Sequence, residues 1–510
     1  MYNFIRSLFP CSQPLLLRKK KTGLVYWASR VLEECDKASA GFAADPVHDL
    51  RVAIRRCRSM ADGFISADAD PAWKQMKRLA KPLFSSLGDL RDAQVMLEWV
   101  AKLSHPDDPV GASLSAALAQ KETALKAAAQ HALAGFDRKQ WASLNAHLAK
   151  RVDRIPMEGL VFQHLALERW IEARGLHRRA LRNRSGVAYH QLRIGIKRLR
   201  YTVENFLPER HTRWSKDLRD LQDALGEVHD FDVLRAMIRV HPELPADERQ
   251  RWYQRIFEER QKRLDLYRRK MMGERSLWEV WRSELPSGPL LEQAGMEKIR
   301  TWAFSVDPDP EHSARVTRFA LELYDALCAC EIIVADPSQH RILEAAAILH
   351  EVGRRNTTNG HGGHQKRGYK AVLKLTPPLG WSEDDMHSVA ILVRYHRGAL
   401  PVTTNSSFVG LTSKKRKDLL PIIGVLRLAN AFDDEHEGNI SSLKIECDND
   451  SVIVYAEGLQ GMSCQAERIA RSRYLLEMIS RHPITVRPLP LAAAASARKI
   501  KSQTPTATVS

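Results

Sequence analysis

The chain has 510 residues, of which 44% are hydrophobic and 27% are charged, and its net charge at pH 7 is +17. This length exceeds what one hydrophobic core supports, so we expect two or three domains. No apolar run approaches the roughly 20 residues that cross a bilayer, which excludes a membrane span. The basic excess favours a polyanionic partner, whether nucleic acid, an anionic membrane surface or polyphosphate.

Residues 1–19 form an N-terminal extension in which a short, proline-broken apolar stretch precedes a basic cluster. A secretory signal peptide has the opposite order, so we expect a cytoplasmic protein. The cysteines form no CxxC pair and have no regular spacing. This distribution predicts reduced, mostly structural thiols.

The first half of the chain contains an internal repeat. HDLRVAIRRCR at 48–58 and HQLRIGIKRLR at 190–200 share six of eleven residues at a constant offset of 142. Each is followed by a second matched segment, LGDLRDAQVML at 87–97 and LGEVHDFDVL at 225–234. Two motifs that recur in the same order predict a duplicated helical unit.

Each copy of the first motif predicts a helix with an apolar face and a positively charged face, since successive residues turn by about 100°. The cationic stripes are His48, Arg51, Arg55 and Arg58 in one copy, and His190, Arg193, Lys197 and Arg200 in the other. No acidic residue shares either stripe. A solvated basic face is the alternative, but the shared register and the missing intrahelical partners favour a polyanion site.

These paired stretches, each followed by an LG-x-x-x-D segment, resemble the CHAD domain, the conserved histidine α-helical domain, over residues 20–285. The resemblance implies two pseudo-symmetric four-helix bundles around a basic groove that binds inorganic polyphosphate. The implied ligands are the two cationic stripes, and neighbouring basic residues join them: Arg56, Lys77, Arg78, Lys81 and Arg198. Arginine forks match phosphate oxygens. Nucleic acid is the competing ligand, but neither stripe carries the aromatic side chains on which bases stack.

After a linker at 286–295, helical patterns continue to residue 440 and carry several histidines. The pair His350-Glu351, with His312, His364, His396 and Asp433, could converge on a divalent metal ion that activates water for phosphoester hydrolysis. Arg394 and Asn430 are further members of this candidate site. A histidine taken alone is more often structural.

Segments such as AILHEVG and LVRYHRGALP resemble the HD-like helical domain at the C-terminal side of the exopolyphosphatase/guanosine pentaphosphatase family, over residues 296–490. That family's actin-like catalytic domain has no counterpart here, and CHAD-like sequence takes its place. Compared with HD phosphohydrolases in general, Glu351 replaces the aspartate that follows the histidine, and Asn430 replaces the closing aspartate. A neutral amide is a poorer ligand for a hard cation. These departures favour an accessory polyphosphate-contacting role over catalysis.

Residues 441–490 predict a small α+β element, because LKIECDNDSVIVYAEG alternates as a β-hairpin and a helix is expected near 464–481. Asn449 and Asp450 would form the turn of the hairpin. The basic tract SKKRK at 413–417 predicts a loop, and residues 491–510 predict a disordered tail.

The sequence therefore predicts a mainly α-helical protein with an HD-like helical domain at 296–440 and the small α+β element after it. We expect it to bind inorganic polyphosphate, in association with polyphosphate granules or other proteins of polyphosphate metabolism. One alternative is a metal-dependent phosphohydrolase acting on polyphosphate or guanosine polyphosphates, for which a divalent metal ion would be the cofactor. The other is a granule scaffold. Of these three possibilities, the sequence favours a binding protein that is not an enzyme.

Overall fold

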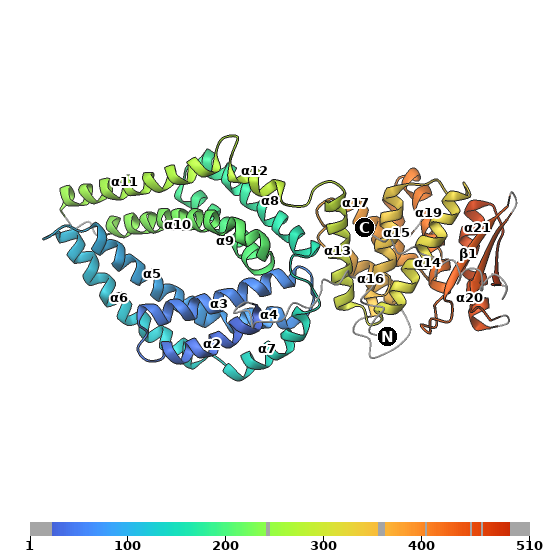
Figure 1. Ribbon diagram of the computed structural model, residues 1–510, viewed down its shortest axis with the longest axis horizontal. Coiled ribbons are helices and arrows are strands. Elements are labelled where there is room, and N and C mark those ends of the chain that lie inside the picture. Colours follow the sequence, from blue (N-terminus) through green and yellow to red (C-terminus); the bar gives the residue numbers. More distant parts are fainter. Residues whose placement is uncertain are drawn as a thin grey trace, which may run out of the picture. The chain divides into compact units, whose positions relative to one another are not determined.

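The computed structural model describes residues 23–240, 245–354, 363–402, 405–448, 451–460 and 463–489. The described residues are mainly helical, with one three-stranded sheet near the C-terminus, which confirms the predicted fold class (Figure 1). The chain divides into two compact units, residues 1–287 and 288–510, and each is described by itself. The N-terminal extension and the tail predicted at 491–510 lie outside the described residues.

The N-terminal unit consists of two sets of helices. The first set comprises α2 (Leu24–Ala38), α3 (Ala44–Ile65), α4 (Pro71–Leu79), α5 (Lys81–Leu103), α6 (Pro109–Ala134) and α7 (Arg138–Val152). The second comprises α8 (Leu160–Asn183), α9 (Gly186–Phe206), α10 (Pro208–Arg239), α11 (Ala246–Met271) and α12 (Leu277–Ser283).

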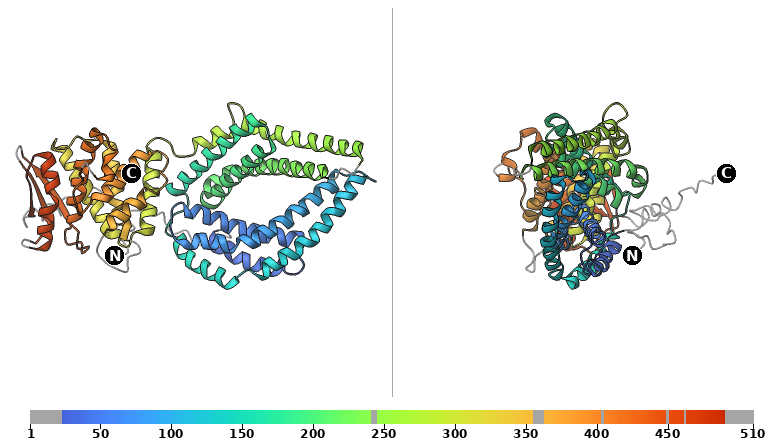
Figure 2. Two further views of the ribbon diagram at one scale, coloured as in Figure 1. Left: turned by 180° about the vertical axis from the view of Figure 1, so that it is seen from behind. Right: turned by 90° about the vertical axis from the view of Figure 1, so that its left-hand side faces the viewer.

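The two sets repeat one packing order. The long helices α2, α3, α5 and α6 pack in sequence on one another, as do α8, α9, α10 and α11 (Figures 1 and 2). The copies differ where the first motif ends. Asp70 caps the short helix α4 by accepting a hydrogen bond from the backbone N–H of Ala72, whereas the second copy passes through Pro208 directly into one long helix. The duplication inferred from the sequence is thus a duplication of helices.

The two sets meet where α3 packs against α9 and where α6 packs against α11. At the first contact the ring of Phe206 stacks on Phe162, with centroids 4.1 Å apart, and meets the edge of Phe64. At the second, Trp99 and Trp252 belong to one buried cluster with residues of both sets. Apolar contacts at both places therefore hold the two copies of the repeat in a defined orientation.

Gly63 on α3 allows the close approach of α3 and α9, because a Cβ there would overlap the ring of Phe206. That ring is held between other aromatic rings and has little room to move. We expect Gly63→Ala to lower the free energy of unfolding by about 1–3 kcal/mol, the usual cost of overpacking. Thermal unfolding of the full chain measures the change.

Gly175 in α8 provides the matched control. It is exposed, and no described atom lies within 4 Å of the position its Cβ would take. Alanine there is expected to raise stability by about 0.5–1 kcal/mol, because glycine is unfavourable inside a helix. A Gly63→Ala variant as stable as the parent would show that α3 and α9 do not pack this closely.

The C-terminal unit is a second helical assembly that ends in the sheet. Its helices are α13 (Pro289–Val306), α14 (Pro310–Ala329), α15 (Pro337–Leu349), the short 3-10 helix η1 (Val352–Arg354), α16 (His364–Val372), α17 (Glu383–Tyr395), α18 (Ser406–Val409), α19 (Ser413–Ala431), α20 (Cys464–Ser472) and α21 (Tyr474–Ser480). Its strands are β1 (Ser442–Cys447), β2 (Val452–Glu457) and β3 (Ile484–Pro488). The start of α13 falls within the segment predicted as a linker.

Strands β1 and β2 form the predicted antiparallel hairpin, although the turn at Asn449 and Asp450 lies outside the described residues. The third strand, β3, was not predicted and pairs parallel to β2. The predicted last helix is present as two shorter helices, α20 and α21, and both pack on α19.

Two sequence predictions about this unit are wrong. The tract 413–417 is the first part of α19 rather than a loop, because the side chain of Thr412 caps the helix by accepting a hydrogen bond from the backbone N–H of Lys415. Cys330 and Cys447 are joined in a disulfide rather than reduced. They are 117 residues apart in sequence, and only the packing of α14 against β1 brings them together. Within the described residues, no helix combines the length and hydropathy needed to cross a membrane.

Candidate functional site

Helices α3 and α9 carry the cationic stripes, and in both helices the opposite face is buried. Leu50, Ile54 and Cys57 are fully buried on α3, and Leu192 and Ile196 on α9. The apolar face of each helix belongs to the core of its own set, so the polar face must look the other way. The periodicity of the sequence thus determines where the positive charges lie.

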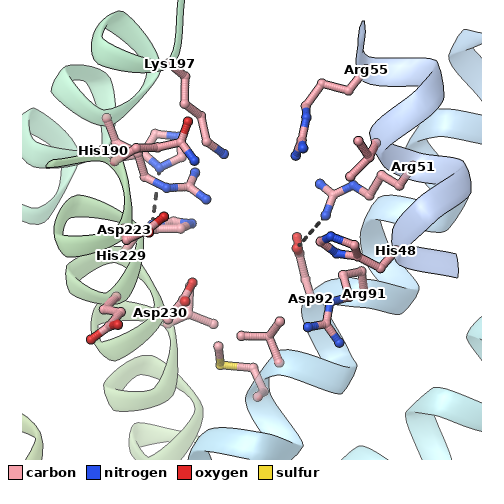
Figure 3. A pocket seen from close by; sticks show the side chains of 18 residues that line it. His48, Arg51, Arg55, Arg91, Asp92, His190, Lys197, Asp223, His229 and Asp230 are labelled. Atoms are coloured by element: carbon pink, nitrogen blue, oxygen red, sulfur yellow. Dashed lines mark hydrogen bonds and ion pairs between the residues drawn. The ribbon is translucent and has the colours of Figure 1, made fainter. Parts of the chain in front are cut away.

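The two polar faces look toward each other across one cavity of about 540 Å³ (Figure 3). The predicted residues that line it are His48, Arg51 and Arg55 from α3, and His190, Arg193 and Lys197 from α9. They occupy the same three motif positions in the two copies. No phenylalanine, tyrosine or tryptophan is among the described residues that line the cavity.

Apart from Val52 on α3, the helices that carry the second motif supply the rest of the lining. They contribute Arg91, Asp92, Val95 and Met96 from α5, and Gln222, Asp223, Gly226, Glu227, His229, Asp230 and Val233 from α10. Arg51 lies 3.5 Å from the carboxylate of Asp92, which is largely exposed. Glu227 is paired instead with Arg263, at 2.5 Å. The acids therefore offset only part of the positive charge that surrounds the cavity.

Burial and mutual repulsion lower the proton affinity of the bases in the cavity. The pKa of Lys197 is lowered to about 7, mainly by burial and then by the charges of three neighbouring arginines. The pKa values of His48 and His190 are lowered mainly by burial and then by nearby cations. Burial lowers the pKa of His229 to about 4 and raises that of Asp230 to about 6. The negative charge of a polyanion bound in the cavity would offset the repulsion between the protonated bases.

Three arginines in the cavity have an incomplete set of hydrogen bonds. The Nε atoms of Arg51, Arg55 and Arg193 are buried and have no hydrogen-bond partner among the described residues. A buried N–H group that lacks an acceptor is costly. These three arginines therefore carry donors that the described residues leave unsatisfied.

The other predicted binding residues of this unit lie away from the cavity, in contacts with the protein itself. Arg58 donates to the backbone carbonyl of Lys77 at 2.7 Å and lies over the ring of Phe84. The remaining contacts are those of Arg56 with Glu204, Lys77 with Asp62, Arg198 with Glu172, and Arg200 with Glu204. Arg78 and Lys81 are exposed. The last residue of each predicted stripe, Arg58 or Arg200, is thus not among the residues that line the cavity.

A second group of functional side chains lies buried in the C-terminal unit. His350 ends α15, Glu351 follows it, and His312 is on α14; their ligand atoms all lie within 4.8 Å of one another. Glu351, His364 and His396 form a second set within the same limit. We call these five residues the histidine cluster. All five are at most 7% exposed.

The other predicted members of this site lie beside the cluster or apart from it. The Asp433 carboxylate accepts hydrogen bonds from His312 Nδ1 at 2.8 Å and from Arg315 Nε at 2.7 Å. Asn430 is buried on α19. Arg394 lies over the ring of Tyr395. Neither of the two sets of ligand atoms includes any of these three residues.

Two family models match the chain, each over one unit. The model of the CHAD domain matches residues 28–239, and that of the Ppx/GppA phosphatase, domain III, matches residues 293–457. The chain contains a CHAD domain at 28–239, followed by Ppx/GppA phosphatase domain III at 293–457. A crystal structure of the CHAD domain from the plant Ricinus communis also matches, with 21% sequence identity and a TM-score of 0.36, over 53% of this chain and 94% of that chain.

Six charged or titratable residues of the CHAD-domain cavity were not predicted as site residues: Arg91, Asp92, Asp223, Glu227, His229 and Asp230. The sequence contained a signal for four of them. Arg91 and Asp92 close the segment LGDLRD, and His229 and Asp230 close LGEVHD. The glycines of these segments lie beside the predicted arginines, since a Cβ at Gly88 would be 3.5 Å from Arg51 and one at Gly226 would be 3.9 Å from Arg193. In each copy the second motif thus lies beside the first, and both line the same cavity.

Proposed function

We propose that this protein binds inorganic polyphosphate in the cavity of its CHAD domain. The observation that carries the proposal is that two duplicated helices present three basic side chains each, at equivalent motif positions, toward one shared cavity. Helical repeats place successive cations about 5.4 Å apart along each helix. A linear chain of phosphates lying between the helices would contact positively charged side chains of α3 on one side and of α9 on the other.

The chemistry of the lining supports a ligand made of phosphate alone. Arginine presents several N–H donors in a planar fork that matches phosphate oxygens. Single-stranded nucleic acids are usually held through aromatic side chains that stack on the bases, and the described lining has none. Tyr201 lies close by, but the guanidinium of Arg55 lies over its ring.

The C-terminal unit would have an accessory role in this scheme. Lys366, Arg367 and Lys370 are exposed on α16 and give the unit a basic surface of its own. Such a surface attracts a polyanion over a distance of about 8–10 Å at physiological salt. The surface would raise the rate at which a long polyphosphate chain is captured.

The proposal is tested by measuring the affinity of the full chain for long-chain polyphosphate and for single-stranded DNA of the same total charge, over a range of salt concentrations. We expect tighter binding of polyphosphate, and an affinity that falls steeply with salt because counterions are released from the polyanion, as they are from nucleic acids. Equal affinity for both ligands would contradict recognition by phosphate alone. An affinity independent of salt would contradict a binding site made of cations.

A further inference from the structure

The orientation of two rings in the histidine cluster is determined by backbone carbonyl groups. His350 Nδ1 lies 2.7 Å from the carbonyl oxygen of Ala347, and His396 Nδ1 lies 2.8 Å from that of Val393. A carbonyl oxygen can only accept, so each Nδ1 carries the hydrogen. In a neutral ring the Nε2 atom then holds a lone pair, and in both residues this atom points into the cluster.

His312 is held in the same way by a carboxylate. Its Nδ1 donates to Asp433, so its Nε2 also points into the cluster, where it lies 3.1 Å from His350 Nε2. Two nitrogen lone pairs at this distance repel each other unless a cation lies between them. Histidines that bind metal ions characteristically donate their other ring N–H to a carboxylate or a backbone carbonyl. These three histidines show that arrangement.

We propose that the histidine cluster binds two divalent transition-metal ions that share the Glu351 carboxylate. One ion would be held by His312, His350 and Glu351, and the other by Glu351, His364 and His396. In the second set, His364 Nε2 lies 3.2 Å from Glu351 Oε1 and 3.3 Å from His396 Nε2. Tetrahedral coordination with bonds of about 2.0–2.1 Å places neighbouring ligand atoms about 3.3 Å apart.

The ligand set indicates the class of metal. Four imidazoles and one carboxylate suit zinc, iron, nickel or copper, whereas magnesium and calcium prefer oxygen ligands throughout. The site differs from the single-ion site predicted from the sequence, because Asp433 positions His312 instead of binding metal, and because His364 and His396 hold a second ion. It lies in the C-terminal unit and does not depend on polyphosphate binding by the CHAD domain.

The proposal is tested by counting the ions that the full chain retains. Protein stripped with a chelator is loaded with excess Zn²⁺, desalted, and assayed for zinc and protein by mass spectrometry and amino-acid analysis. We expect two ions per chain. His350→Gln and His396→Gln should each leave one, and Glu351→Gln fewer than one, because its carboxylate belongs to both sets. Excess Mg²⁺ should displace neither ion.

His340→Gln is the matched control, since His340 is a partly exposed histidine of α15 that lies 3.5 Å from Asp325 and outside the cluster; it should retain two ions. A parent chain that retains one ion or none overturns the proposal, and this count does not depend on whether any variant folds. The absence of bound zinc would mean that a proton separates His312 from His350. Retention of two ions by a folded Glu351→Gln variant would rule out the shared carboxylate.

Discussion

Replacing Arg51 and Arg193 together with alanine is expected to weaken polyphosphate binding by more than about a hundredfold. Hydrogen bonds to charged groups contribute about 1.5–3 kcal/mol each, so the loss of two arginines from the cavity should cost about 3 kcal/mol or more. Both side chains line the cavity, one from each copy of the repeat. Titration of the full chain with long-chain polyphosphate at fixed salt measures the effect.

Arg198→Ala is the matched control for this double substitution. Arg198 belongs to the second copy of the same motif, but it is exposed and paired with Glu172. We expect its removal to change the affinity by less than about threefold, since exposed ion pairs contribute about 0–1 kcal/mol. The double variant should melt no lower than the parent, because it relieves repulsion among cations. Equal loss of affinity in the control and the double variant would mean that the outer surface, not the cavity, binds the ligand.

Polyphosphate affinity is expected to fall as the pH rises above about 7, because Lys197 loses its proton. Its pKa in the free protein is lowered to about 7 by burial and by the neighbouring arginines. A bound polyanion favours the charged form, so the pKa is higher in the complex and binding takes up a proton. By linkage, one proton corresponds to a change of at most about tenfold in affinity per pH unit.

Lys197→Arg tests the assignment of this pH dependence to one residue. Arginine stays charged throughout, so the variant should bind equally well at pH 7 and pH 9. The other groups that face Lys197 are Arg193 on the same helix, Arg51 and Arg55 on α3, and Asp92 on α5. A variant that keeps the parent's pH dependence would show that another group is responsible.

The repeat in the sequence predicted the six basic residues that line the cavity from α3 and α9. A duplicated motif determines which face of each helix is polar and which positions of the two copies correspond. It did not predict the direction of the last arginine in each stripe. Arg58 turns toward the Lys77 carbonyl and Phe84, which belong to α4 and α5, and helical periodicity contains no information about such neighbours. The acids of the cavity were missed for a related reason, since they come from the neighbouring helices α5 and α10.

The spacing of the histidine-cluster residues in the sequence does not give the distances between them in the fold. His312, His350, Glu351, His364 and His396 were predicted to converge on one metal ion, whereas in the structure their ligand atoms form two sets that share Glu351. Asp433 was also predicted as a ligand because its chemistry is suitable. In the structure its carboxylate accepts hydrogen bonds from His312, Arg315 and the backbone of Gly438. Such choices depend on distances between residues far apart in the chain.

The most direct test of polyphosphate binding in the cavity is a crystal structure of the full chain with a short polyphosphate. It should show phosphate groups between α3 and α9, within hydrogen-bonding distance of Arg51 and Arg55 on one side and of Arg193 and Lys197 on the other. Phosphate groups found only on the outer surface, at residues such as Arg78, Lys81 or Arg198, with none in the cavity, would contradict the account.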